Sequence, residues 1–121
     1  MGVACFIVLD AEEPGFDPFV NGKAVAADAD AVNRIADRLG LQRFESYLCQ
    51  DLSEFDVPQP ATEWFAAEEG LRWSRALKEY VAEHPDSVRD ATGIIADLDE
   101  YAKVFDEART RGLRWHFELD Y

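Results

Sequence analysis

An unbroken alternation of apolar and polar residues runs through positions 113–121: Leu113-Arg114-Trp115-His116-Phe117-Glu118-Leu119-Asp120-Tyr121. A period of two is typical of a β-strand with one face in the core and the other solvated or functional. A shift of one residue would move three aromatic side chains out of the core, so the register is strongly determined. We expect the odd-numbered side chains to face the core and the even-numbered ones to lie on the opposite face.

A second strand is predicted at the other end of the sequence. Residues 3–9 form a continuous apolar run, which is typical of a strand buried on both faces and away from the sheet edge. Charged residues and the turn dipeptide Pro14-Gly15 end this run. Because strands need partners, we expect the two terminal strands to pair with each other.

The segment between residues 16 and 48 is less clear. Apolar residues recur at helical spacing over about 24–39, so we favour a helix there, beginning as late as Asp28 and ended by Gly40. Asn21-Gly22 supports either an N-cap for this helix or a hairpin turn. Residues 41–48 fit a short helix and a strand equally well. Residues 51–60 are predicted to be a loop.

Two long helices should follow. The first begins near Ala66 or Ala67 and ends at His84-Pro85. The second follows a cap at Asp86 or Ser87 and runs to about Arg111, before Gly112. The short connection predicts an antiparallel helix hairpin. Gly70 falls on the buried stripe of the first helix, where it costs about 1 kcal/mol, so we expect another element to approach closely there.

The elements together predict a single domain of the α+β class over residues 1–121. Its small antiparallel sheet contains the N- and C-terminal strands, with or without a third, and packs against three to four helices. Apolar residues make up 48% of the chain, which is ample for a core. Cys5 and Cys49 are expected to be reduced and buried or half-buried, since two thiols and no Cys-x-x-Cys form neither a disulfide framework nor a zinc site.

The chain is strongly acidic. It has 25 acidic and 12 basic residues, a net charge of −13. Both halves share it: residues 1–61 have 11 acids and 4 bases, and residues 62–121 have 14 and 8. This field repels nucleic acid and anionic membranes, and it either attracts a basic protein or only maintains solubility. No run of about 20 apolar residues is present, and residues 1–10 lack the basic start of a signal peptide, so we expect a cytoplasmic protein.

The polar face of the last strand is one candidate site. His116, Glu118 and Asp120 alternate along it, which spaces their side chains about 7 Å apart on one side. Asp10, at the end of the first strand, would join them if the two strands are neighbours. Such a set suits a divalent metal or an acid/base pair. The alternative is a solvated face, with Arg114 offsetting part of the charge.

A second candidate site lies at the entry of the first long helix. Trp64, Phe65 and Trp73, together with Glu68 and Glu69, are consistent with a protein-binding surface of aromatic residues with an acidic rim. The alternative is ordinary core filling by these aromatic residues. The pairs Asp28/Asp30 and Asp97/Asp99 are interpreted as solvated helix positions, because residues two apart do not face each other on a helix.

No sequence motif for nucleophilic catalysis, nucleotide binding or a cofactor is present. The leading hypothesis is therefore a small acidic protein-interaction module for a basic partner, such as an inhibitor, immunity-type protein or adaptor, rather than an enzyme. The alternative is a small metal-dependent hydrolase or ligand-binding protein that uses the polar face of the last strand. A third interpretation is a homodimer formed through that strand.

Overall fold

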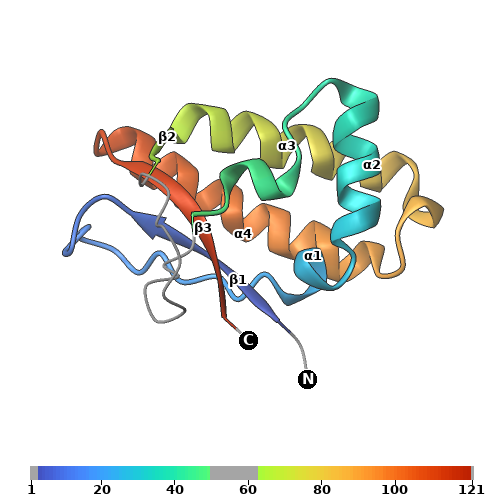
Figure 1. The fold of residues 1–121 in the computed structure, drawn as a ribbon, viewed down its shortest axis with the longest axis horizontal. Coiled ribbons are helices and arrows are strands. Elements are labelled where there is room, and N and C mark those ends of the chain that lie inside the picture. Colours follow the sequence, from blue (N-terminus) through green and yellow to red (C-terminus); the bar gives the residue numbers. More distant parts are fainter. Residues whose placement is uncertain (1–2, 50–62, 121) are drawn as a thin grey trace, which may run out of the picture.

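The computed structural model describes residues 3–49 and 63–120, and Figure 1 shows its arrangement. Within these residues four α-helices accompany a three-stranded antiparallel sheet, so the predicted α+β class is confirmed. The predicted loop at 51–60 lies outside the described residues. The strands are β1 Ala4–Leu9, β2 Phe65–Ala66 and β3 Arg114–Asp120. The helices are α1 Lys23–Ala27, α2 Ala29–Leu39, α3 Ala67–Glu83 and α4 Ala91–Thr110, with short 3-10 helices η1 Phe44–Tyr47 and η3 Pro85–Ser87.

The sheet is built on β3, which lies between β1 and β2. The two terminal strands pair antiparallel, from Ala4 opposite Asp120 to Leu9 opposite Trp115, as predicted. The very short β2 pairs with the start of β3. Further along the same side of β3, Leu48 forms a single parallel bridge with Phe117. The central strand of the described sheet is therefore the one with the unbroken alternation.

The prediction that the first strand is away from the sheet edge and buried on both faces is wrong. β1 pairs only with β3 in the described sheet, and its residues alternate between half-buried and buried. Apolar residues on both faces concealed this alternation in the sequence, because Phe6 and Val8 lie on the outer face and are only half-buried. The free edge is partly protected, since the Cys5 amide donates to the Asn21 carbonyl at 2.7 Å.

The helix expected over 24–39 is present but is divided into α1 and α2 at Asp28, whose backbone is not helical (φ −125°, ψ 38°). Asn21-Gly22 forms the entry to α1 and not a hairpin: Gly22 is left-handed (φ 59°), and Asn21 Oδ1 accepts from the Lys23 amide at 3.0 Å. Gly40 ends α2 at φ 72°, as predicted. Residues 41–48 contain η1 and the single bridge at Leu48.

α3 and α4 form the predicted antiparallel hairpin and lie side by side in Figure 1. The expected start of the second helix at Asp86 or Ser87 is wrong. Those residues belong to η3, and the Ser87 hydroxyl donates to the His84 carbonyl at 2.6 Å. The helix begins instead at Ala91, where the Asp90 carboxylate accepts from the Gly93 amide at 3.0 Å.

The core lies between the inner face of the sheet and the helices, which gather on one side of it (Figure 1). Trp115 and Phe117 of β3 are fully buried, with ring centroids 4.8 Å apart. Phe105 of α4 packs 4.5 Å from Trp115, and Tyr47 of η1 packs 4.8 Å from it. The inward side of the alternating strand is therefore the centre of an aromatic core, which leaves its even-numbered side chains on the outer face.

Candidate functional site

Part of each predicted site lies on the face of the sheet that points away from the helices: His116 and Glu118 from one, and Trp64 from the other. The strand register places Val8 opposite His116 and Phe6 opposite Glu118. Residues opposite each other in a strand pair share a face. Trp64, which directly precedes β2, lies against His116 with ring centroids 4.4 Å apart and planes at 39°. We call these five residues the outer sheet face: Phe6, Val8, Trp64, His116 and Glu118.

His116 is the buried residue of this surface and packs beneath Trp64. It is only 3% exposed, although it lies on the polar side of β3. Its Nε2 is 2.8 Å from Glu118 Oε2, and because a carboxylate can only accept, Nε2 is the donor. Nδ1 is buried and has no hydrogen-bond partner in the described part of the chain. Neither ring nitrogen is available to solvent, so the histidine orients Trp64 and Glu118 and is a poor candidate for a general base.

The proposed metal set is not brought together. β1 and β3 are neighbours, but their antiparallel register places Asp10 beside Arg114 and not beside His116. The Asp10 carboxylate accepts from the Arg114 amide at 2.9 Å and from its guanidinium at 3.2 Å. The side chain of Asp120 lies outside the described structure. In residues 3–49 and 63–119, no three His, Cys, Asp or Glu side chains are grouped to hold a metal ion.

The predicted aromatic site is also divided by the fold. Trp73 was predicted to be part of a binding surface, but it is 1% exposed and its indole donates to the Gln42 carbonyl at 3.0 Å. It is a core residue because it lies on the buried stripe of α3. Phe65 packs edge-on against Tyr47 at 5.0 Å, on the inner side. Only Trp64 remains at the outer surface, since successive residues of an extended chain point to opposite sides.

The two glutamates of that predicted site lie in the first turn of α3. Glu69 accepts a hydrogen bond of 2.7 Å from the Tyr47 hydroxyl, and Glu68 is exposed. The helix dipole favours both carboxylates at this position. Their presence is therefore explained by the local structure of α3, and neither contacts the outer sheet face.

Two aspartates interpreted as solvated have structural roles instead. Asp97 of α4 is half-buried and accepts from the Ala24 and Val25 amides at 2.9 and 3.2 Å, so it caps α1 from another helix. Burial raises the pKa of its carboxyl group, and these two bonds partly oppose that rise. Asp28 is 8% exposed and accepts from the Arg89 amide at 2.9 Å. The partners are at least 61 positions away, so no local pattern could have revealed these caps.

Both cysteines are free thiols, as predicted, with Cys5 buried and Cys49 half-buried. Burial raises the pKa of the Cys5 thiol to about 12. The Tyr101 hydroxyl donates to the Cys5 carbonyl at 2.7 Å and closes off the same position. A thiol that stays protonated at neutral pH is not a nucleophile, so Cys5 is part of the core.

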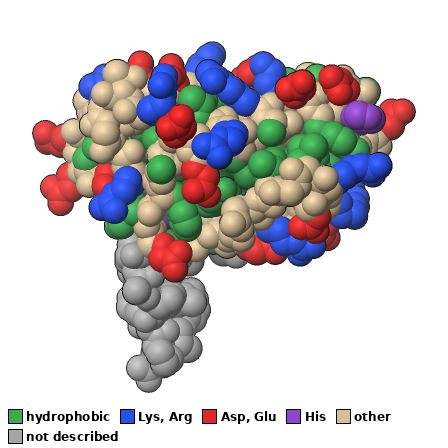
Figure 2. Space-filling model, turned by 90° about the horizontal axis from the view of Figure 1, so that it is seen from above, with side chains coloured by type: hydrophobic (Ala, Val, Ile, Leu, Met, Phe, Trp, Pro, Cys, Tyr) green, Lys and Arg blue, Asp and Glu red, His purple; other side chains and the backbone are tan. Residues whose placement is uncertain are grey.

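Folding separates the charges that are evenly distributed along the sequence. The helical regions, residues 23–47 and 67–111, have 15 acids and 11 bases, a net charge of −4. The remaining described residues have seven acids and one base, Arg114, a net charge of −6. Figure 2, which looks down on the α2–α3 side, shows Lys and Arg interspersed among acidic side chains. The sheet and its adjoining segments are therefore the more negative part of the described molecule.

Comparisons with family models, with curated proteins and with solved structures found no match. Among the described helices, none has the length and apolar character needed to cross a membrane.

Proposed function

We propose that this chain is a protein-interaction module that binds a basic protein through its outer sheet face. The observation that supports it most directly is the half-buried Trp64, which stacks on the buried His116, whose ring in turn donates to the acidic Glu118. A rigid aromatic side chain with a charged rim is the arrangement that commonly dominates protein–protein binding energy.

Electrostatics supports a basic partner. A net charge of −13 accelerates association with a positively charged protein, and the effect weakens as salt screens it. The sheet and its adjoining segments, with seven acids and one base in the described residues, contribute most to this field. Apolar surface from Phe6 and Val8 adjoins Trp64 and supplies area that contact with a partner would bury.

The chemistry of this surface suits an inhibitor, an immunity-type protein or an adaptor, each of which covers a basic partner. A cytoplasmic location is part of the proposal. Two free thiols, Cys5 and Cys49, are compatible with it, because thiols remain reduced in that compartment.

The test is affinity capture from the native host at low salt, followed by measurement of binding with the purified partner. Three proteins are compared: the wild type, Glu118→Gln and Trp64→Ala. We expect the captured partner to be basic, its affinity to fall steeply with salt, and each variant to weaken binding at least tenfold.

A matched control separates the site from the total charge. Glu83→Gln removes one exposed acid from the helical side and changes the net charge by the same amount. It should retain most of the affinity. If Glu118→Gln and Glu83→Gln weaken binding equally, the outer sheet face is not the binding surface, and if the wild type captures no basic protein the proposal is wrong.

A further inference from the structure

A groove follows the seam between α3 and α4, on the helical side of the molecule and away from the outer sheet face. Its volume is about 440 Å³. Leu71 and Ala76 of α3 supply its apolar lining, and Leu71 is 6% exposed. Three arginines also line it, which is unusual on a chain with a net charge of −13.

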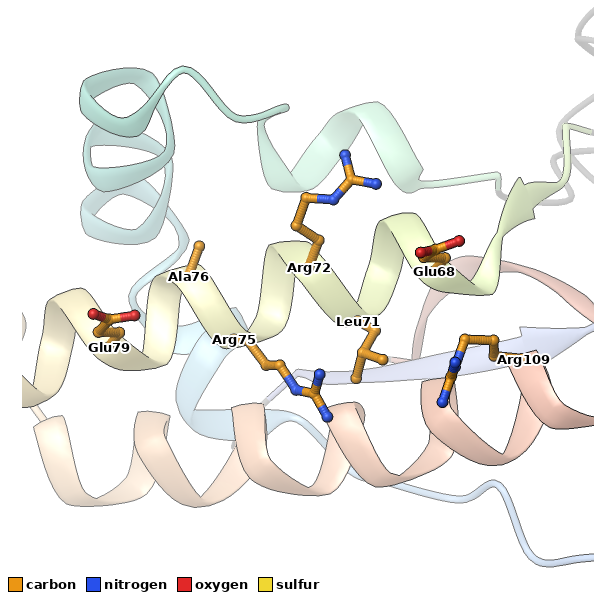
Figure 3. A pocket seen from close by; sticks show the side chains of 7 residues that line it. All are labelled: Glu68, Leu71, Arg72, Arg75, Ala76, Glu79 and Arg109. Atoms are coloured by element: carbon orange, nitrogen blue, oxygen red, sulfur yellow. The ribbon is translucent and has the colours of Figure 1, made fainter.

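Two of these arginines lie on either side of Leu71 (Figure 3). Figure 3 shows Arg75 of α3 and Arg109 of α4 reaching over the seam with Leu71 between them. Arg72 points to the other side of α3 in the same view. The groove therefore presents one guanidinium from each helix on either side of an apolar floor.

The guanidinium of Arg75 forms no ion pair with any residue that the structure describes. Six of the 12 basic residues form an ion pair in the described structure, and Arg75 is not among them. Arg109 pairs with Asp106 on its own helix, at 2.6 Å through one terminal nitrogen. Because a guanidinium has five N–H donors, Arg109 retains donors for a ligand.

The groove continues into a second cavity of about 290 Å³ that shares Arg75. Lys103 lines this part and has no ion pair among the described residues. The Ser74 hydroxyl at the same seam is fully buried without a hydrogen-bond partner in the described chain. Lys103 thus adds one more basic side chain without an ion pair in the described structure, although Asp99 and Asp106 line the same cavity.

The acidic residues of the groove restrict the charge of a ligand. Glu68 and Glu79 lie at opposite ends of the α3 segment that lines it (Figure 3). A doubly charged phosphate would be repelled by both, whereas a singly charged carboxylate meets less repulsion and matches the planar fork of a guanidinium. We propose that the α3–α4 groove binds a small carboxylate whose apolar part packs on Leu71, with Arg75 and Arg109 holding the carboxylate group.

The experiment is a titration of the isotope-labelled full chain, observed by NMR, with three probes: benzoate, its neutral analogue benzamide, and phenyl phosphate. Benzoate should shift the amide signals of Leu71 and Ala76 and the Nε–H signals of Arg75 and Arg109. Benzamide should leave them unchanged. If phenyl phosphate binds and benzoate does not, the preference for a carboxylate is wrong.

Two variants test the assignment. Arg75→Gln should weaken benzoate binding about tenfold, the contribution typical of one charge-assisted hydrogen bond. Lys23→Gln removes an exposed lysine of α1 that also has no ion pair in the described structure, and it should leave the affinity unchanged. Both positions are exposed, so both variants should fold, which near-ultraviolet circular dichroism verifies. No shift at the groove with benzoate, or equal weakening by the two variants, would overturn the proposal.

Discussion

Replacing Gly70 by alanine should destabilise the protein, although alanine is the better helix former. Gly70 is in the interior of α3 and faces α4. A Cβ atom at this position would lie 2.7–2.8 Å from three ring atoms of Phe105. The ring cannot move aside easily, because Phe105 is fully buried and packs 4.5 Å from Trp115.

The magnitude follows from two opposing contributions. Alanine in place of glycine gains about 1 kcal/mol in a helix interior. Overpacking a well-packed core costs about 1–3 kcal/mol. The expected net loss for Gly70→Ala is therefore about 1 kcal/mol. Replacing the Phe105 ring by the smaller side chain of leucine should reverse the sign of the stability change. In a Phe105→Leu background, Gly70→Ala should therefore stabilise the protein by up to about 1 kcal/mol.

Urea denaturation of the four proteins in this double-mutant cycle measures the effect. The substitution Ala96→Gly, at an exposed interior position of α4, calibrates the helix-propensity contribution and should cost about 1 kcal/mol. If Gly70→Ala stabilises the protein in the wild-type background, the close approach of α4 at Gly70 is not a packing constraint, and the explanation offered for this glycine fails.

Three further outcomes are expected from urea denaturation. Tyr101→Phe should cost about 1–2 kcal/mol, because it leaves the buried Cys5 carbonyl without its 2.7 Å hydrogen bond; no loss would mean that this carbonyl finds another donor. Asp90→Ala should cost about 1 kcal/mol through loss of the cap on Gly93, whereas Asp90→Asn should cost less. Burial raises the folded-state pKa of Asp97, so the fold holds this proton to higher pH than the unfolded chain does. The stability of the wild type relative to Asp97→Asn should thus be highest below the unfolded pKa and decline as pH rises through the folded pKa; the opposite trend would show that its two amide bonds outweigh burial.

Sequence patterns correctly predicted those features of the fold that depend on short stretches of chain. The alternation of residues 113–121 gave the correct buried side of β3, with Trp115 and Phe117 in the core. Gly40 and Gly112 end their helices at positive φ, and Gly70 marks the close helix contact. Each of these depends on neighbours in sequence or on the conformational freedom of a single glycine. The same patterns could not locate the start of α4, because Pro85–Ser87 form a competing 3-10 turn.

The candidate sites were predicted only in part. His116, Glu118 and Trp64 do share the face of the sheet opposite the core, with His116 buried beneath Trp64, but the sequence assigned them to two separate sites. Trp73 was assigned to a surface because an aromatic residue on a helix looks the same whether it fills a core or binds a partner. The α3–α4 groove was not foreseen, since Arg75 and Arg109 are 34 positions apart in the sequence and meet only when the helices pack.

The sequence by itself determined the class of fold, the two terminal strands, the helix hairpin and the strong negative charge, because composition and short-range periodicity carry that information. The tertiary structure decided which partners the charged and aromatic side chains contact. Antiparallel pairing of β1 with β3 placed Asp10 beside Arg114, and the approach of the chain before β2 placed Trp64 on His116. Eleven of the 12 basic residues belong to the helical regions 23–47 and 67–111, on the other side of the sheet from this surface (Figure 1). Such pairings depend on register and on contacts between distant segments, and no local pattern encodes either.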